Sequence, residues 1–529
     1  MRNLDLAGRS PVHSSNGMAA TSHPLATLAA LDVLKEGGNA IDAAVAACAV
    51  QCVVEPQSTG IGGDCFALFA MGGGAVKAIN GSGRAPAGIS AEALLDQGIE
   101  EIGEQSPHSV TVPGAVDAWD RLVRDHGTRS LGALLQPAIT YAREGYPVHS
   151  RVSVDWAGCV ENLSLDPTAA RIFLPGGKPP AVGSIHRQPE LAETLARIAE
   201  DGRDGFYGGV VAEDMVGYLN GLGGTHSLAD FAETRCDYVE PIRTGYRGYE
   251  VYECPPNGQG IIALEMLNIL SGFDLAALAP LSPERLHLEI EATRLAYRDR
   301  GDLLADPQQA DVPVAAMLSE SRAAALRARI DPTRAMTPPA PNSLPLHRDT
   351  VYLCVVDKDR NAVSFINSIY HSFGSALVSP KTGVVLHNRG CGFVVDPAHP
   401  NCVAPRKRPL HTIIPGMLVK DGRAVMPFGV MGGDYQATGH ARLLTNLIDF
   451  GLDLQESIDL PRVFAQPDGP VDCESGVPAE TVAALEALGH ATLPAAKPIG
   501  GGQAIMIDWQ SGVLTGASEP RKDGCALGY

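Results

Sequence analysis

Thr350 is the residue whose type and position most clearly allow chemistry. It opens a strand-like run, residues 350–357, directly behind a twenty-residue segment, 330–349, that contains five prolines and is typical of an exposed linker. Cutting the chain before Thr350 would free an α-amine beside the Thr350 hydroxyl. Such an amine has a reference pKa of about 7.7–8.0, so it can act as general base for that hydroxyl at neutral pH. The position indicates the nucleophile of a self-cleaving precursor, although most threonines in strands only pack.

The elements around Thr350 predict sheets covered by layers of helices. The chain before the linker has mostly helical patterns, and the chain after it is richer in strands. Expected helices are 24–36, capped by Ser22, and 40–53, capped by Asn39, with further helical stretches within 113–147, 189–222, 258–300, 438–450, 454–459 and 477–488. Expected strands are 65–71, 75–80, 350–357, 362–370, 382–387, 413–420, 424–429 and 503–508.

Composition and charge exclude several classes of function. The 41 basic and 60 acidic residues give a formal charge of 41 − 60 = −19, which argues against nucleic acid and anionic membranes as partners. Residues 1–18 lack the apolar core of a signal peptide, so we expect a cytoplasmic protein. The sequence contains neither Cys-x-x-Cys nor His-Glu-x-x-His, so we expect no metal and no cofactor.

Thirteen segments, in order along nearly the whole chain, resemble the gamma-glutamyltransferase family of N-terminal-nucleophile hydrolases. No single segment is decisive, but the ordered set is very specific. The segments are 22–25, 37–45, 54–56, 60–63, 112–115, 255–260, 291–300, 350, 355–363, 408–409, 432–433, 461–462 and 528–529. This resemblance makes Thr350 the expected nucleophile.

The resemblance implies an α/β (α+β) fold, a four-layer αββα sandwich built from two subunits that are cut from one precursor. The helix-rich large subunit would be 1–349, and the small subunit would be 350–529. The Thr350 hydroxyl would attack an amide carbonyl and form an acyl-enzyme, and water or an amine would take the acyl group. The implied partners are therefore a small-molecule amide and the two subunits of one precursor, as a processed heterodimer or a homo-oligomer of it.

The resemblance also carries three helper residues over to this sequence. Gly432 and Gly433 match paired glycines whose N–H groups stabilise the oxyanion, and such donors are each worth roughly 3–4 kcal/mol in the transition state. Ser368 matches a threonine that positions the freed α-amine. For these positions the alternatives are a plain turn and the polar face of a strand.

The residues that would bind a glutamate substrate depart from the family pattern. Where the family has the arginine for the α-carboxylate, this chain has Ser82, and Arg84 lies two residues further on, about 6.6 Å along the same strand face. The stretch 388–393 has no acid where an aspartate normally binds the α-amine. The segment 393–408 is too short for the lid loop of many relatives, which implies an open pocket.

Three more positions near the expected pocket change chemical type. The paired serines of the family become His411 and Thr412, and an asparagine becomes Tyr370. Since a desolvated ammonium needs an anionic partner, the loss of the acid favours an acyl group with a carboxylate and no α-amine, glutaryl-like or oxamate-like. Arg84 would meet that carboxylate, with His411, His371 and Arg389 as further donors; the alternative is that Arg84 is a surface arginine outside the pocket.

Two other functions remain open from the sequence. The first is a true gamma-glutamyl hydrolase or transpeptidase that acts on glutathione or gamma-glutamyl amides, with Asp434 taking the ammonium. The second is an uncleaved binding protein without catalysis.

Overall fold

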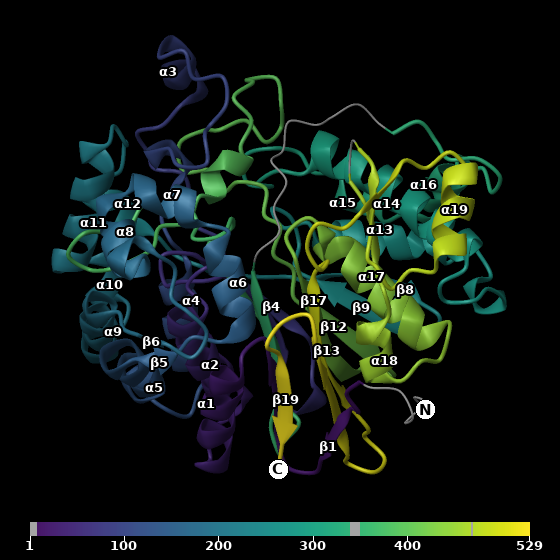
Figure 1. Ribbon diagram of the computed structural model, residues 1–529, viewed down its shortest axis with the longest axis horizontal. Coiled ribbons are helices and arrows are strands. Elements are labelled where there is room, and N and C mark those ends of the chain that lie inside the picture. Colours follow the sequence, from purple (N-terminus) through teal and green to yellow (C-terminus); the bar gives the residue numbers. More distant parts are fainter. Residues whose placement is uncertain (1–7, 339–349, 467–468) are drawn as a thin grey trace.

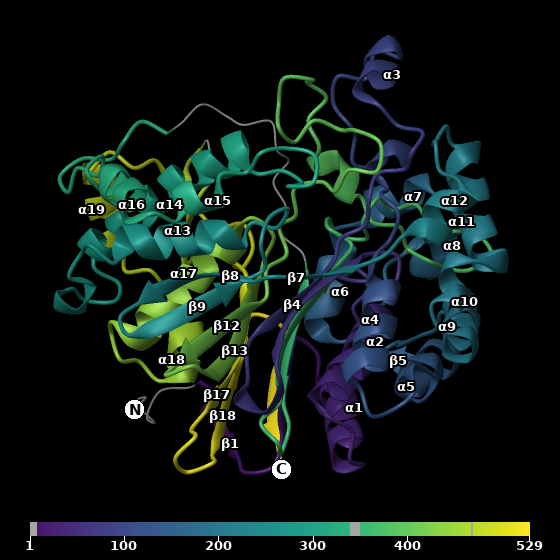
Figure 2. The same cartoon turned by 180° about the vertical axis from the view of Figure 1, so that it is seen from behind.

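Two seven-stranded antiparallel sheets face each other at the centre of the molecule (Figure 1, and Figure 2 from behind). The computed structural model describes residues 8–338, 350–466 and 469–529. The first sheet has the order β19 (Cys525–Gly528), β2 (Met18–Thr21), β10 (Val351–Val356), β11 (Ala362–Ser368), β3 (Asp64–Ala70), β4 (Lys77–Gly81) and β7 (Asp237–Val239). The second has the order β1 (Val12–Ser14), β18 (Leu514–Ser518), β17 (Gly501–Ile507), β13 (Arg423–Met431), β12 (Gly416–Lys420), β9 (Tyr249–Glu253) and β8 (Ile242–Tyr246).

A layer of helices covers the outer side of each sheet (Figure 1). Over the first sheet lie α1 (Pro24–Lys35), α2 (Ala40–Val54), α4 (Ala115–His126), α5 (Leu131–Glu144) and α9 (Pro189–Asp201). Over the second lie α13 (Gly260–Leu270), α14 (Pro283–Leu303), α17 (Tyr435–Ile448) and α18 (Leu454–Asp459). The expected four-layer αββα sandwich is thereby confirmed.

Strand β10 shows how the sequence builds these layers. Leu353 and Val355 join the core beneath α2, whereas Tyr352 and the two residues that alternate after it join the core between the sheets. Alternation with a period of two places successive side chains on opposite faces, so both faces of this strand are buried. Between the sheets the packing is close: a Cβ at Gly429 of β13 would lie 2.4 Å from the Tyr352 ring.

One of the two predicted N-caps, that of α2, is confirmed, and the other, that of α1, is wrong. Asn39 caps α2 as expected, in a reciprocal capping box with Asp42. The prediction of Ser22 as the cap of α1 is wrong, because the side chain of His23 accepts the hydrogen bond from the N–H of Leu25. The Ser22 hydroxyl instead donates to Glu55, 2.7 Å away, a partner that lies 33 positions along the chain.

The strand predicted at 382–387 is also wrong. These residues form only two isolated bridges, Gly62 with Leu386 and Val378 with Val385. The N–H of Thr382 donates instead to the Asp214 carboxylate, and Gly383 has a φ of +67° that interrupts an extended backbone. The division into a helical first part and a strand-rich second part is likewise too simple, because each large sheet takes strands from both parts.

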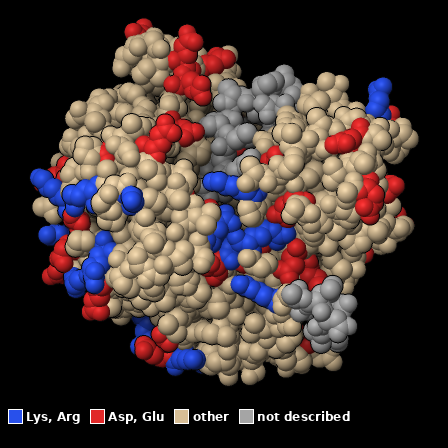
Figure 3. Space-filling model, in the orientation of Figure 1, with Lys and Arg blue, Asp and Glu red and all other residues tan. Residues whose placement is uncertain are grey.

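Charged groups are unevenly distributed over the surface. In the face shown in Figure 3, basic side chains gather near the middle and along the left edge, and acidic side chains stand at the top, at the right and among the basic ones. None of the described helices is long and apolar enough to cross a membrane.

Candidate active site

Thr350 lies at the end of the first sheet, in a row of polar residues on three neighbouring strands. The register of β10 and β11 pairs Val351 with Asn367, which puts Thr350 opposite Ser368. The register of β11 and β3 pairs Ser368 with Asp64. The hydroxyl oxygens of Thr350 and Ser368 are 3.1 Å apart, and both residues are buried. The structure thus brings the predicted nucleophile and its predicted helper into contact.

Ser368 also fixes the backbone that follows it. Its hydroxyl accepts a hydrogen bond of 2.9 Å from the N–H of Tyr370, where β11 has ended. Tyr370 has a φ of +77°, a conformation that costs free energy for a bulky side chain and is often found at functional sites. The turn places the Tyr370 ring against the guanidinium of Arg389, whose Cζ lies 3.9 Å from the ring centroid.

Asp64 is a buried carboxylate with a full set of partners. One oxygen accepts from the N–H groups of Gly83 and Gly114, at 2.9 and 3.1 Å, and the other lies 3.0 Å from Nε2 of His411. Burial alone would raise the pKa of Asp64, but His387, His411 and Arg389 together outweigh it and lower the pKa to about 2. The carboxylate is therefore ionised and binds these loops to the sheet.

Both ring nitrogens of His411 form hydrogen bonds within the protein. Burial, together with the nearby Arg389 cation, lowers the pKa of His411 to about 3, so its ring is neutral. Nδ1 accepts from the N–H of Ile413 at 3.4 Å, which leaves Nε2 as the donor to Asp64. Sequence reasoning made His411 a candidate substrate contact, and the structure gives it this structural bond.

The paired glycines form the turn between β13 and α17. Gly432 and Gly433 have φ values of +124° and +58°, a region that favours glycine. Their carbonyls accept from the N–H groups of Tyr435 and Gln436, at 3.0 and 3.2 Å, in the first turn of α17. A Cβ at Gly432 would lie 2.7 Å from the Cα of Gly500, so the turn is closely packed. The N–H groups of Gly432 and Gly433 are the backbone donors that this turn offers.

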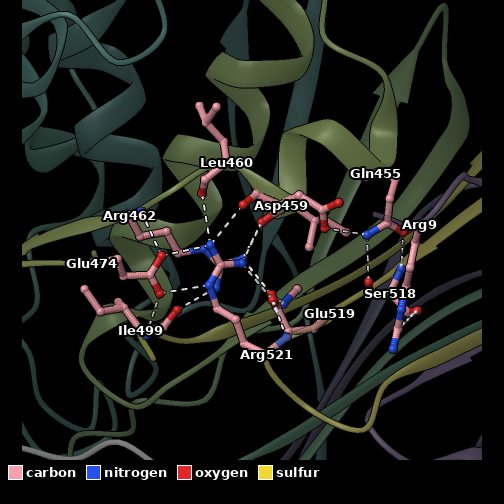
Figure 4. A network of polar contacts seen from close by, with 12 residues as sticks. Arg9, Gln455, Asp459, Leu460, Arg462, Glu474, Ile499, Ser518, Glu519 and Arg521 are labelled. Carbon is pink, nitrogen blue, oxygen red and sulfur yellow. Dashed lines mark hydrogen bonds and ion pairs between the residues drawn. The ribbon is translucent and has the colours of Figure 1, made fainter. Parts of the chain in front are cut away.

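A polar network holds the segment that packs against Gly432 (Figure 4). Arg462 and Arg521 donate to the carboxylate of Glu519, at 2.6 and 2.8 Å, and Arg462 also donates to the carbonyl of Ile499 at 2.5 Å. Burial alone would raise the pKa of Glu519, but the two arginines lower it to about 2. The network therefore fixes Ile499, and with it the glycine that touches Gly432.

Gln259 joins the glycine turn to the segment that contains His411 and Thr412. Its Nε2 donates to the carbonyls of Thr412 and Gly433, at 2.8 and 3.1 Å, and its Oε1 accepts from Arg300 at 2.9 Å. Arg300 also forms a buried ion pair with Asp434. The predicted site residues Thr412, Gly433 and Asp434 are thereby held together, and Asp434 already binds a cation of the protein.

Arg389 is a buried cation that uses only one of its three guanidinium nitrogens for hydrogen bonds within the described residues. It is fully buried, and its Nη1 donates to the Thr412 hydroxyl at 2.8 Å. Its Nε and Nη2 have no hydrogen-bond partner in the described part of the chain. Burial lowers the pKa of Arg389 to about 10, so the group remains a cation at neutral pH.

Arg84 lies in a different environment. Its guanidinium is 3.4 Å from Asp306 and 3.6 Å from Asp237, and it donates to Gln308 and to the carbonyl of Arg406. It lines a cavity of about 350 Å³ whose lining includes neither Thr350 nor the paired glycines. The structure thus places Arg84 among protein partners rather than beside the row of Thr350.

The other two predicted substrate contacts lie closer to that row. Ser82 is buried, and its hydroxyl accepts from Asn257 at 3.1 Å. The ring of His371 stacks on that of Tyr370, with centroids 4.4 Å apart, and Asn388 lies 2.8 Å from its Nδ1.

One cluster among the described residues has the composition of a metal site: His287, Glu291 and His490. Arg294 donates to Nδ1 of His490 at 3.3 Å and pairs with Glu291. Nε2 of His490 must then carry the proton that it shares with His287, 2.8 Å away, and His287 in turn donates to the Asp331 carbonyl. A hydrogen-bonded chain and a cation thus occupy the cluster, which ties α14 to the segment at Asp331.

Sequence reasoning did not identify Asp64, Asn257, Gln259 or Arg300 as site residues. All four lie in or next to segments that carry the family resemblance. Their presence in those segments was the available signal, but their roles depend on contacts with residues more than 40 positions away, such as Gln259 with Thr412 and Gly433.

Known proteins are similar to this chain over nearly its whole length. A family model described as gamma-glutamyltranspeptidase matches residues 26–529. A Bacillus subtilis protein named glutathione hydrolase-like YwrD proenzyme is 37% identical over 526 residues, which cover 97% of this chain and 98% of that protein. An oxamate amidohydrolase proenzyme of Klebsiella pneumoniae is 37% identical over 536 residues, covering 98% and 100%. The crystal structure of a cephalosporin acylase from Bacillus halodurans superposes with a TM-score of 0.94 at 40% identity, covering 100% and 98%.

Proposed function

The chain belongs to the gamma-glutamyltranspeptidase family of hydrolases and acyltransferases, and we propose that Thr350 is its nucleophile. The observation that carries the proposal is the buried contact of 3.1 Å between the Thr350 and Ser368 hydroxyls at the end of the first sheet. The relatives named as proenzymes support a precursor that is cut into two subunits. In this chain the subunits are 1–349 and 350–529.

The first reaction is self-cleavage. The Thr350 hydroxyl attacks the carbonyl carbon of residue 349, and the chain shifts from the amide nitrogen to the hydroxyl oxygen. Water then hydrolyses the resulting ester, which frees the carboxyl group of residue 349, the Thr350 hydroxyl and the Thr350 α-amine. Ser368 is within hydrogen-bond distance of the attacking oxygen and can orient it.

The second reaction uses the freed amine. It takes the hydroxyl proton while the oxygen attacks the carbonyl carbon of an amide substrate. The N–H groups of Gly432 and Gly433 stabilise the oxyanion. The C–N bond breaks, the proton passes to the leaving amine, and water or another amine releases the acyl group from Thr350. No step requires a metal or an organic cofactor.

The acyl specificity differs from that of a glutathione enzyme. The stretch 388–393 offers no acid for an α-ammonium, and Asp434 is already paired with Arg300. The relative named for oxamate supports an acyl group without an adjacent ammonium, because an oxalyl group carries a carboxylate and no amine. We therefore infer an amidohydrolase for glutaryl-like or oxamate-like amides.

A gamma-glutamyl hydrolase or transpeptidase is the second candidate. A relative named glutathione hydrolase-like favours it, and Asp434 supplies a carboxylate directly after the glycine pair. In that case a bound ammonium would have to share Asp434 with Arg300.

A gel tests the nucleophile. The purified chain of 55.4 kDa should convert without added protease into two bands, with a new N-terminus at Thr350. Thr350→Ala should remain one chain and hydrolyse no amide. Thr350→Ser, which keeps a hydroxyl, should still cleave itself. Cleavage of Thr350→Ala at the same bond would show that Thr350 is not the nucleophile.

A further inference from the structure

One edge of the Arg389 guanidinium has the properties of an unfilled anion site. Nε and Nη2 are the two adjacent donors on that edge, and both are buried without a partner among the described residues. The remaining nitrogen, Nη1, is held by Thr412. The Tyr370 ring lies against the guanidinium and fixes its position. The group is therefore oriented by the protein, but only part of its hydrogen-bonding capacity is used.

An unpaired buried cation is costly, and the nearby acids act on Arg389 only through space. No carboxylate of the described residues lies within ion-pair distance of Arg389, although both Asp64 and Asp434 contribute to its field. Asp64 already accepts three hydrogen bonds, and Asp434 is paired with Arg300. Proteins normally pair such a charge, and unpaired ones cluster where a ligand completes them.

Arg389 lies between the two halves of the proposed reaction centre. On one side, it contacts Tyr370, whose N–H donates to Ser368, and Ser368 contacts Thr350. On the other side, Thr412 is joined through Gln259 to Gly433. We therefore expect an acyl group bound to Thr350, with its carbonyl oxygen at the glycines, to have its far end near Arg389.

We propose that Nε and Nη2 of Arg389 bind the carboxylate of the substrate's acyl group through two parallel hydrogen bonds. The proposal rests on the amidohydrolase function given above and identifies the residue that selects its substrate. Two parallel donors match the two oxygens of a carboxylate. The substrate class is thus an amide of a dicarboxylic acid that carries no ammonium beside its free carboxylate.

Two matched substrates isolate this contact. Glutaryl anilide and valeryl anilide have acyl chains of the same length, and only the first ends in a carboxylate. In the self-cleaved wild type, kcat/KM should be higher for the glutaryl substrate. Arg389→Met should reduce that value by about 10²–10³-fold, mostly through KM, and should change the value for the valeryl substrate by less than about threefold.

Two further variants separate recognition from a general effect of mutation. Arg389→Lys keeps a charge but loses the two-point geometry, so kcat/KM for the glutaryl substrate should fall by an intermediate amount. Arg121→Met removes another guanidinium that lies over a tyrosine ring, 4.6 Å from the Tyr238 centroid. It should leave the ratio of the two substrates unchanged.

Stability distinguishes a substrate contact from a structural residue. Arg389→Met should keep or raise the Tm, because it removes a buried charge that has no acidic partner. A much lower Tm, or an equal loss of activity on both substrates, would overturn the proposal. If the wild type shows no Thr350-dependent turnover of any amide, the proposed function itself fails. If it turns over both anilides equally, only the role of Arg389 fails.

Discussion

Two arginines in this molecule, Arg84 and Arg389, differ in how far they are buried and in which groups their guanidinium donors bind. Arg84 is one-quarter exposed at its side chain and lies close to two carboxylates, Asp306 and Asp237. Arg389 is fully buried, touches a tyrosine ring and a threonine hydroxyl, and leaves two donors unused. The first stabilises contacts between loops. The second has two buried donors, Nε and Nη2, that a ligand could satisfy.

The comparison shows that position along a strand does not identify a binding residue. Arg84 is nearer in sequence to the arginine position of the family, but Asp306, 222 positions away, takes its guanidinium. Arg389 occupies a stretch in which the family has an acid for the ammonium. At this stretch a basic residue stands where the family has an acidic one, which agrees with the proposed substrate, a carboxylate without an ammonium.

The largest expected effect concerns the choice between acyl groups in the wild type. Gamma-glutamyl anilide differs from glutaryl anilide only by the α-ammonium, which would be desolvated close to Arg389. We expect kcat/KM to be about 10²–10³-fold lower for the gamma-glutamyl substrate, from steady-state rates of anilide release. A higher value for gamma-glutamyl anilide that is lost in Asp434→Asn would establish the gamma-glutamyl alternative.

Asp64 should govern stability in acid. Its pKa is about 2 in the folded protein, below its ordinary value of 3.8, so its ionised form favours folding. That contribution is fully present above about pH 4 and is lost as the pH falls towards 2. It amounts to about 2 kcal/mol. Urea unfolding of Asp64→Asn should therefore show lower stability at pH 6 and a weaker loss between pH 4 and 2. An unchanged acid dependence would contradict the pKa of Asp64.

The Thr412 hydroxyl should matter through Arg389. Thr412→Val removes the acceptor of the 2.8 Å hydrogen bond that orients the guanidinium but preserves the shape of the side chain. We expect KM for glutaryl anilide to rise about tenfold, while valeryl anilide is unaffected. Equal effects on both substrates would mean that Thr412 acts on the reaction centre and not through Arg389.

The smallest effect should come from Arg84. Arg84→Met leaves Asp306 and Asp237 without this cation, and we expect the free energy of unfolding to fall by about 1 kcal/mol. The ratio of glutaryl to valeryl turnover should not change. Thermal unfolding and the two anilide assays on one preparation check both statements.

The sequence predicted elements whose signals are local. Asn39 and Asp42 cap α2 within three residues, and the hairpin of β10 and β11 aligns Thr350 with Ser368 across one short turn. Predictions failed where a distant residue decided the outcome. Glu55 takes the hydroxyl of Ser22, and Asp214 takes backbone N–H groups near Thr382.

The site follows the same division. Thr350 and the glycine pair lie in segments that carry the family resemblance, and Ser368 follows one of them within a few residues. The environments of Arg84, His411 and Arg389 depend on Asp306, Asp64 and Thr412, and only the fold brings these partners to them. A buried donor without an acceptor has no sequence signal, because the folded chain alone determines which acceptors lie near it.

The most direct test of this account compares Arg389→Met with Arg84→Met, both self-cleaved, in the kcat/KM ratio of glutaryl to valeryl anilide. We predict that the ratio falls about 10²–10³-fold in Arg389→Met and stays at the wild-type value in Arg84→Met. The opposite pattern, with the ratio preserved in Arg389→Met and lost in Arg84→Met, would show that Arg84 binds the acyl carboxylate and that the unpaired edge of Arg389 does not.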